Sequence, residues 1–193
     1  VTEVKLVSRR AAVRTEETRL GNLIADAMRD AVGAEVAITN GGAIRGDRTY
    51  KAGTTLTRKD ILQELPFGNV TVLIELSGAD LRAALENGVS QVEDKAGRFP
   101  QVSGLNFVYD PAAPTGSRVV EVTVGGEPLE ISRFYRVATN DFIQGGGDGY
   151  AALERGKVLI DAASGQLLAT TVMDYIAAAE TVAPIIEGRI VAK

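Results

Sequence analysis

Residues 18–45 read TRLGNLIADAMRDAVGAEVAITNGGAIR, an apolar-periodic segment followed by a short apolar run and paired glycines. The periodic segment predicts a helix over residues 18–31, with Gly33 as its C-terminal cap. The run at residues 36–39 predicts a short buried strand that ends in the turn 40–42. The apolar residues at helical spacing are Leu20, Leu23, Ile24, Ala27, Met28 and Ala31.

The rest of the chain continues to mix helices and strands. Further helices are predicted over residues 57–65, 77–89 and 164–179. Strands are predicted over residues 70–76, 105–109, 119–124 and 135–139. Several of these strands follow one another as hairpin neighbours, which favours an α+β fold over a doubly wound parallel sheet. Because no repeat or linker interrupts the pattern, we expect one domain over residues 1–193.

The composition excludes several kinds of chemistry. The 193 residues include no cysteine and no histidine, which excludes disulfides, zinc–thiolate sites, cysteine nucleophiles and histidine general bases. An all-carboxylate magnesium or calcium site stays possible. The net charge of −4 argues against a nucleic-acid surface, and no stretch is long and apolar enough for a membrane span.

A glycine-rich turn with an arginine, NGGAIR in residues 40–45, follows the strand at 36–39. The glycines let the backbone take positive φ angles and approach a ligand closely. Arg45 offers a planar fork of donors that suits phosphate or carboxylate. The alternative is an ordinary turn with a solvated arginine, and the motif alone does not decide between the two.

Two loops carry aromatic residues. Phe67 lies in PFGN at residues 66–69, and Phe142 begins FIQGGGDGY at residues 142–150. The second loop is neither a Walker A loop nor an EF-hand, since it lacks the Gly-Lys-Ser/Thr sequence and the spaced acidic ligands. Its carboxylate, Asp148, could accept hydrogen bonds from paired hydroxyls such as those of a ribose. The alternatives are a core role for Phe67 and a turn role for Asp148.

Arg9, Arg10 and Arg14 precede the first predicted helix, and a solvated charge run is the alternative for them. Considered together, however, the loops supply the parts of a nucleotide site. Two aromatic rings could stack on a base, several arginines could bind phosphate, and Asp148 could bind the sugar hydroxyls.

The motifs also resemble a known family in their order along the chain. Residues 18–28 (TRLGNLIADAM), NGGAIR, PFGN, FIQGGGDGY and the closing EGRI at 187–190 resemble the C-terminal domain of the 5'-nucleotidase family. That family includes bacterial UDP-sugar hydrolases and animal ecto-5'-nucleotidases. The resemblance implies a four-layer α/β/β/α arrangement, with two sheets between helices. It also implies a partner, an N-terminal metallophosphoesterase domain that binds two divalent metals, which we expect to be absent from this chain.

The resemblance assigns roles to individual residues. Phe67 and Phe142 match the pair that clamps the base, and Asp148 matches the aspartate that binds the ribose. The residues that match phosphate-binding arginines are Arg14 and Arg45, with Arg10 matching a further arginine of bacterial members. Asn40 and Asn69 match positions near the base, and Gly42 belongs to the glycine turn. Ala43 replaces a glycine that is usual in this turn, and Asp141 stands where some relatives have asparagine.

The parent enzyme is therefore expected to release phosphate from nucleoside 5'-monophosphates or related nucleotides. This domain is expected to bind a nucleotide or nucleoside without a cofactor and to hydrolyse nothing by itself. The alternatives are a parent acting on 2',3'-cyclic nucleotides, UDP-sugars or a thiosulfonate-type substrate, and a stand-alone nucleotide-binding module. By analogy with relatives, we expect a periplasmic or extracellular location, with any signal peptide upstream of Val1.

Overall fold

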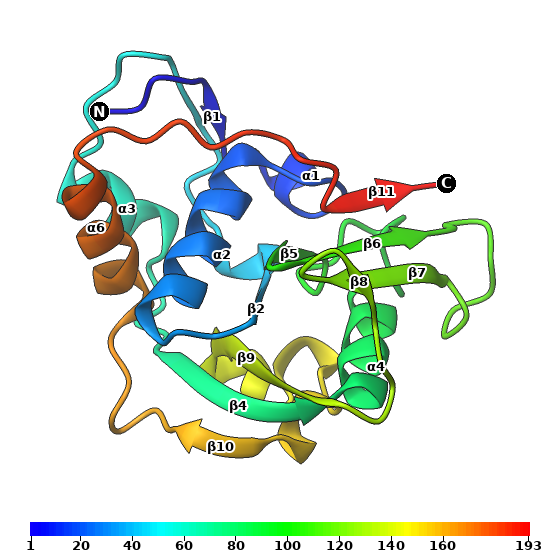
Figure 1. Cartoon of the computed structure of the whole chain (residues 1–193). Coiled ribbons are helices and arrows are strands. Elements are labelled where there is room, and N and C mark those ends of the chain that lie inside the picture. The colour runs from blue at the N-terminus through cyan, green and yellow to red at the C-terminus, as the bar shows by residue number, and fades with distance from the viewer.

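The computed structural model describes residues 1–193 and contains two principal sheets with helices packed against them (Figure 1). The larger sheet has five strands, and only β2 and β9 are parallel neighbours in it. In spatial order its strands are β10 (Lys157–Ile160), β4 (Thr71–Ser77), β9 (Phe134–Asn140), β2 (Val36–Asn40) and β5 (Pro100–Ser103).

The smaller sheet has four strands and lies on the right in Figure 1. In spatial order they are β11 (Ile190–Ala192), β6 (Leu105–Tyr109), β7 (Val119–Val124) and β8 (Glu127–Pro128). Strand β11 is parallel to β6, so the C-terminal segment completes this sheet. A separate pair joins β1 (Leu6–Val7) to β3 (Thr49–Tyr50), which ties the N-terminal segment to the chain beyond the glycine turn.

The helices begin and end largely where their capping residues predict. The α-helices are α1 (Arg10–Val13), α2 (Arg19–Ala31), α3 (Arg58–Glu64), α4 (Gly78–Gly88), α5 (Asp141–Gln144) and α6 (Leu168–Ala179). Short 3-10 turns are η1 (Gly41–Ala43), η2 (Gly147–Gly149) and η3 (Leu153–Arg155). The Thr18 side chain accepts from Gly21 N at the start of α2, and Thr57 and Asp60 form a capping box at the start of α3. Gly33 follows α2 with a φ of 57°, as a C-terminal cap requires.

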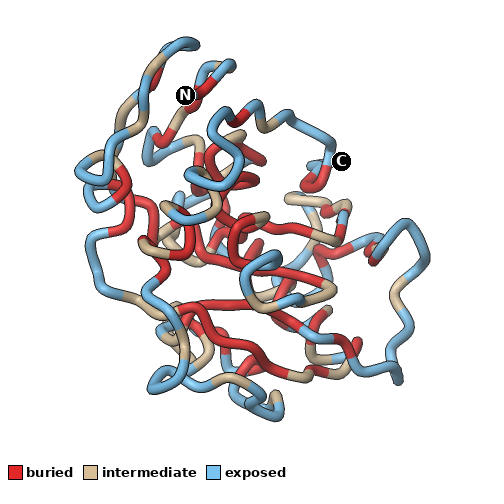
Figure 2. The backbone as a smooth tube through the Cα atoms, turned by 60° about the vertical axis from the view of Figure 1, so that its left-hand side comes forward, coloured by how far each residue is buried: buried red, intermediate tan, exposed pale blue.

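The two faces of the large sheet are covered by different elements. One face packs against α2, α3 and α6 in a cluster that includes Ala37 and Ala138. The other face packs against α4 and the smaller sheet and includes Ile38 and Val137. Neighbouring residues of a strand point to opposite faces, so β2 and β9 contribute to both cores. Figure 2 shows the buried residues concentrated in the middle of the molecule, with the exposed residues around it. The α+β class predicted from the sequence is confirmed.

The predicted start of the last helix is wrong. Helix α6 begins at Leu168 rather than at Ser164. Ser164 N donates to Asp161 Oδ1 over 2.9 Å, which makes a turn, and Gln166 O accepts from Thr71 N over 2.8 Å. The segment before α6 therefore extends along the start of β4, because its backbone groups are already bonded there.

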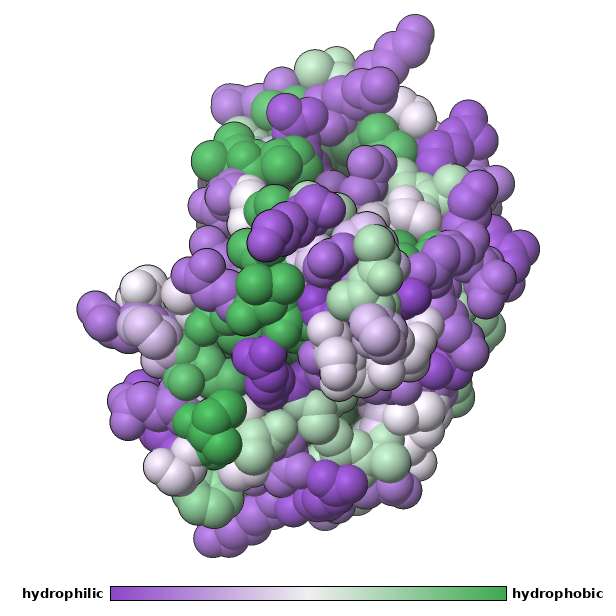
Figure 3. All heavy atoms as spheres, turned by 90° about the vertical axis from the view of Figure 1, so that its right-hand side faces the viewer, coloured by the Kyte–Doolittle hydropathy of each residue, from purple (hydrophilic) through white to green (hydrophobic).

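The surface mixes hydrophobic and hydrophilic side chains. On the side that carries the smaller sheet, a narrow hydrophobic band lies among hydrophilic residues (Figure 3). Val120 of β7 and Val191 of β11 are exposed strand residues. None of the helices combines the length and the apolar character needed to cross a bilayer.

Candidate functional site

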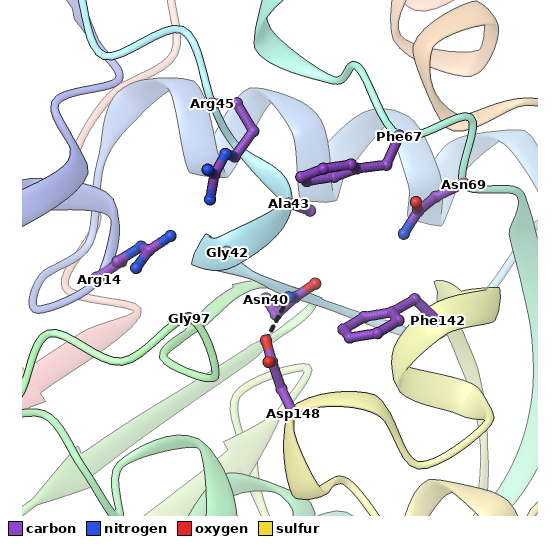
Figure 4. Close-up of a pocket in the computed structure, with 10 residues that line it drawn as sticks. All are labelled: Arg14, Asn40, Gly42, Ala43, Arg45, Phe67, Asn69, Gly97, Phe142 and Asp148. Carbon is purple, nitrogen blue, oxygen red and sulfur yellow. Dashed lines mark hydrogen bonds between the residues drawn. The ribbon is translucent and has the colours of Figure 1, made fainter.

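A cavity of about 540 Å³ opens at one end of the large sheet, within the range of small-ligand sites. Its walls come from five regions far apart in the sequence, as Figure 4 shows. The lining residues are Arg14, Asn40, Gly42, Ala43, Arg45, Phe67, Asn69, Gly97, Phe142 and Asp148.

Strand direction explains why these loops meet. Because β2 and β9 are parallel neighbours, their last residues, Asn40 and Asn140, lie at the same edge of the sheet. Strand β4 is antiparallel to β9, and Thr71 pairs with Asn140. The segment that carries Phe67 and Asn69 therefore enters at that edge too. In open sheets, ligands commonly bind beyond the carboxyl ends of parallel strands.

The two phenylalanines of the pocket are not core residues. Phe67 is 60% exposed and Phe142 is 49% exposed. Figure 4 shows the two rings one above the other with the pocket between them. The Arg45 guanidinium carbon lies 5.4 Å from the centroid of the Phe67 ring, a cation–π contact at the pocket wall. Water-exposed rings on opposite walls of a pocket suit a flat, stackable ligand.

An asparagine chain joins the two ring-bearing loops to the carboxylate. Asn69 Nδ2 donates to Asn140 Oδ1 over 3.3 Å, and Asn140 Nδ2 donates to Asn40 Oδ1 over 3.1 Å. Asn40 Nδ2 then donates to Asp148 Oδ2 over 2.7 Å. Asn140 is fully buried and also caps α5, since its Oδ1 accepts from Ile143 N. These successive hydrogen bonds between asparagine side chains fix the orientations of the amides at the floor of the pocket.

Asp148 is held in an uncommon backbone conformation. Its φ is 54° and its ψ is 20°, the left-handed region that few non-glycine residues adopt. Asn87 Nδ2 donates to the Asp148 carbonyl over 3.2 Å and helps to hold the residue there. Only one of the two carboxylate oxygens has a protein partner, so the other is available to a ligand hydroxyl.

Two arginines line the pocket without forming an ion pair. Arg14 is buried, its Nη1 donates only to the Lys95 carbonyl at 3.4 Å, and its Nε has no partner. Burial, followed by the charges of Arg10 and Arg45, lowers the pKa of Arg14, and the charge of Asp148 acts in the opposite direction. Positive groups that crowd one another without a counterion favour an anion in the space beside them.

A close backbone approach closes the pocket behind these charges. Gly42 N donates to the Gly97 carbonyl over 2.7 Å. A Cβ on Gly42 would lie 2.9 Å from Gly97 Cα, so a larger residue would push the two segments apart. The glycine turn after β2 therefore packs against the loop that precedes β5.

The structure brings together every site residue predicted from the sequence except Arg10. Arg10 lies one helical turn before Arg14, is exposed, and its backbone N donates to Asp47 Oδ1 over 3.0 Å. Its role as a phosphate ligand stays a prediction. Gly97 and Asn140 were not predicted from the sequence. A signal for Asn140 was present, because β2 and β9 both end in Thr-Asn.

No group of three or more aspartate or glutamate side chains is arranged to hold a metal ion. The polar groups of the pocket are instead one carboxylate, two guanidinium groups and two amides. This set is suited to binding a polar anionic ligand, and it contains no nucleophile with an adjacent general base.

Comparison with known proteins identifies the class of protein. The 5'-nucleotidase precursor from Thermus thermophilus has the same fold with a TM-score of 0.91 and 42% identity, covering 99% of this chain and 38% of that one. The sulfate thiohydrolase SoxB of the same genus shares the fold at a TM-score of 0.80 and 24% identity, covering 100% of this chain and 34% of that one. The fold is thus the layered α+β domain of 5'-nucleotidase-type hydrolases, as predicted.

A family model described as "5'-nucleotidase, C-terminal domain" matches residues 1–155, and the chain belongs to this family. The 5'-nucleotidase of Homo sapiens is 32% identical, covering 92% of this chain and 34% of that protein. A snake venom 5'-nucleotidase of Gloydius brevicauda is 34% identical, covering 93% of this chain and 34% of that protein. The chain therefore spans about a third of the length of these relatives.

Proposed function

We propose that this chain is the nucleotide-recognition domain of a 5'-nucleotidase-type phosphohydrolase. The observation that carries the proposal is the pairing of two exposed rings, Phe67 and Phe142, with two arginines that have no carboxylate partner. The rings would hold a base between them by stacking. Arg14 and Arg45 would bind the phosphate through charge-assisted hydrogen bonds, with Arg10 nearby.

The ribose would lie between these two ends. Asp148 offers one free carboxylate oxygen, and a carboxylate accepts hydrogen bonds from both hydroxyls of a ribose. Asn40 and Asn69 would contact the base or sugar from the floor of the pocket, where Asn140 orients them.

The hydrolytic step is assigned to a second domain. Two divalent metals there would activate a water for attack on phosphorus. The residues of this chain do not fit such a centre, because no carboxylate cluster is present. The role of this chain would be to bind the nucleotide and present its phosphate. A location outside the cytoplasm is part of the proposal, and the venom origin of some relatives supports it.

The rings also favour a base-bearing substrate over the alternatives. A thiosulfonate group has no flat surface to stack on Phe67 and Phe142. A 2',3'-cyclic nucleotide or a UDP-sugar carries a base too and would use both rings in the same way. A stand-alone binding module would show the same pocket without a hydrolytic partner.

Calorimetric titration of the 193-residue chain with AMP, UMP and adenosine tests the proposal. Phe67→Ala and Phe142→Ala should each lower AMP affinity by about tenfold or more, since stacking on one ring contributes on the order of 1–3 kcal/mol. Phe134→Ala is the matched control, because Phe134 is 61% exposed at the opposite end of β9. Equal AMP affinity in all four proteins would show that the rings do not clamp a base.

A further inference from the structure

Glu64, the last residue of α3, is a buried carboxylate without an ion pair. It is 1% exposed, and no lysine or arginine lies within ion-pair distance of it. Its Oε1 accepts from Ser8 Oγ over 2.9 Å and from Tyr50 Oη over 2.8 Å. Its Oε2 accepts from Gly46 N over 3.0 Å. Burying a carboxylate is unfavourable unless its oxygens accept hydrogen bonds. The Glu64 carboxylate therefore holds its three donors, Ser8, Tyr50 and the Gly46 backbone, firmly in place.

Two bonds to Glu64 enclose Arg45. Arg45 N donates to the Glu64 carbonyl over 2.8 Å, and the next backbone N–H, that of Gly46, donates to the Glu64 carboxylate. The Cα of Arg45 is therefore fixed on both sides by one residue. The Arg45 guanidinium forms no ion pair and lies against the Phe67 ring. Its position in the pocket consequently depends on its backbone.

The contact between Gly46 and the Glu64 carboxylate is closely packed and leaves no room for a larger side chain. A Cβ on Gly46 would lie 2.0 Å from Glu64 Oε1, closer than any real contact. Only glycine at position 46 leaves room for the carboxylate. Burial, and then the hydrogen bond to Glu64, raises the pKa of Tyr50, so the phenol stays protonated and continues to donate.

Glu64 also lies three residues before Phe67, so it connects both parts of one pocket wall. Leu65, which follows Glu64, is buried in the core that α2, α3 and α6 share, and this packing anchors the turn out of α3. We propose that Glu64 is a positioning residue that holds the Arg45 guanidinium beside the Phe67 ring, and so sets the spacing between phosphate and base. This inference rests on the proposed nucleotide function. It predicts a specific loss of phosphate recognition when Glu64 is removed.

The test compares AMP with adenosine, which lacks the phosphate, on the full 193-residue chain. Glu64→Ala should lower AMP affinity by about tenfold, equivalent to about 1.4 kcal/mol, and leave adenosine affinity nearly unchanged. Gly46→Ala should have the same selective effect, because the new methyl group displaces the carboxylate. Glu64→Gln should retain most AMP affinity, since its remaining oxygen can still accept from Gly46 N while Ser8 and Tyr50 reorient.

Glu17 provides a matched control for general loosening of the fold. It is also a buried carboxylate without an ion pair, and it accepts from Glu187 N, Arg189 N and Asn22 Nδ2. Glu17→Ala should reduce stability without changing the ratio of AMP to adenosine affinity. If Glu17→Ala changes that ratio as much as Glu64→Ala does, or if Glu64→Ala weakens both ligands equally, the positioning role is wrong.

A second readout needs no ligand. Nuclear Overhauser contacts between the Arg45 side chain and the Phe67 ring should be present in the wild type and in Glu17→Ala, and lost in Glu64→Ala. If the wild type binds neither AMP nor adenosine, the proposed function fails, and these contacts still decide the role of Glu64. Their persistence in Glu64→Ala would overturn the inference.

Discussion

Two polar cavities on this molecule differ in whether their buried arginine has a carboxylate partner. In a groove of about 690 Å³ beside α2, Arg189 binds Asp26 through Nη1 at 2.7 Å and Nη2 at 3.0 Å, and Glu187 through Nε at 2.6 Å. Burial acts to lower the pKa of Arg189, but Asp26 and Glu187 outweigh it and the pKa is raised. In the smaller pocket of about 540 Å³, Arg14 has no such partner and its pKa is lowered.

The contrast shows that cavity size does not identify a ligand site here. The larger groove already contains the carboxylates that its arginine needs, so an anion there would have to displace them. The smaller pocket contains a buried guanidinium whose Nε lacks a partner. A buried charge without a partner is unfavourable in the empty protein, and an arriving phosphate would relieve it. The paired arginine stabilises the fold, and the unpaired one is free for binding.

The largest expected effect is on stability and comes from removing the carboxylate that pairs with Arg189. Asp26→Ala should lower the free energy of unfolding by about 3 kcal/mol, because it leaves Arg189 buried with a lost bidentate partner. Urea denaturation measures this loss. AMP affinity should be unchanged, since the groove lies outside the pocket. If this variant loses AMP binding at temperatures where it stays folded, the claim that the groove serves stability and the pocket serves binding is wrong.

Removing the unpaired arginine, Arg14, should weaken binding without lowering stability. Arg14→Met should weaken AMP binding by about 2 kcal/mol, roughly thirtyfold, because it deletes charge-assisted hydrogen bonds to phosphate. Stability should stay the same or rise, since a buried charge without a counterion is removed. Calorimetry and urea denaturation give the two values. A destabilised variant with normal AMP affinity would mean that Arg14 serves the fold.

A smaller effect is expected at the pocket floor. Asn140→Ala should lower stability by about 1 kcal/mol, since it removes the cap of α5 and leaves the amides of Asn40 and Asn69 without their shared partner. AMP and adenosine affinity should fall together, because the proposed binding mode puts the base and sugar, rather than the phosphate, against the floor. Thermal melts and titrations measure both effects, with the exposed Asn106→Ala as control. A loss confined to AMP would place Asn140 at the phosphate end instead.

The sequence predicted those elements whose signals are local. Helix α2 carries its own apolar period and its own cap, so its limits were right. Strands β5 and β10 were missed, because a four-residue strand has too few residues to show a period. The spatial order β10-β4-β9-β2-β5 could not be predicted, since it depends on pairing between distant segments.

The pocket was predictable where a motif placed a chemical group in a loop. Phe67, Phe142 and Asp148 belong to such motifs, and the structure brings them to one cavity. Gly97 belongs to no motif, and its carbonyl accepts a hydrogen bond from Gly42 N at the pocket. Contacts of that kind arise from tertiary packing and leave no pattern in the chain.

Proton NMR of AMP during titration with the chain tests most directly whether the two rings enclose a base beside unpaired arginines. Stacking between Phe67 and Phe142 should move the adenine H2 and H8 resonances upfield at saturation. Either ring-to-alanine variant should reduce that shift, while Arg14→Met should retain it once saturated. Adenine resonances that stay in place at saturation, or that move equally in Phe67→Ala, would contradict the account.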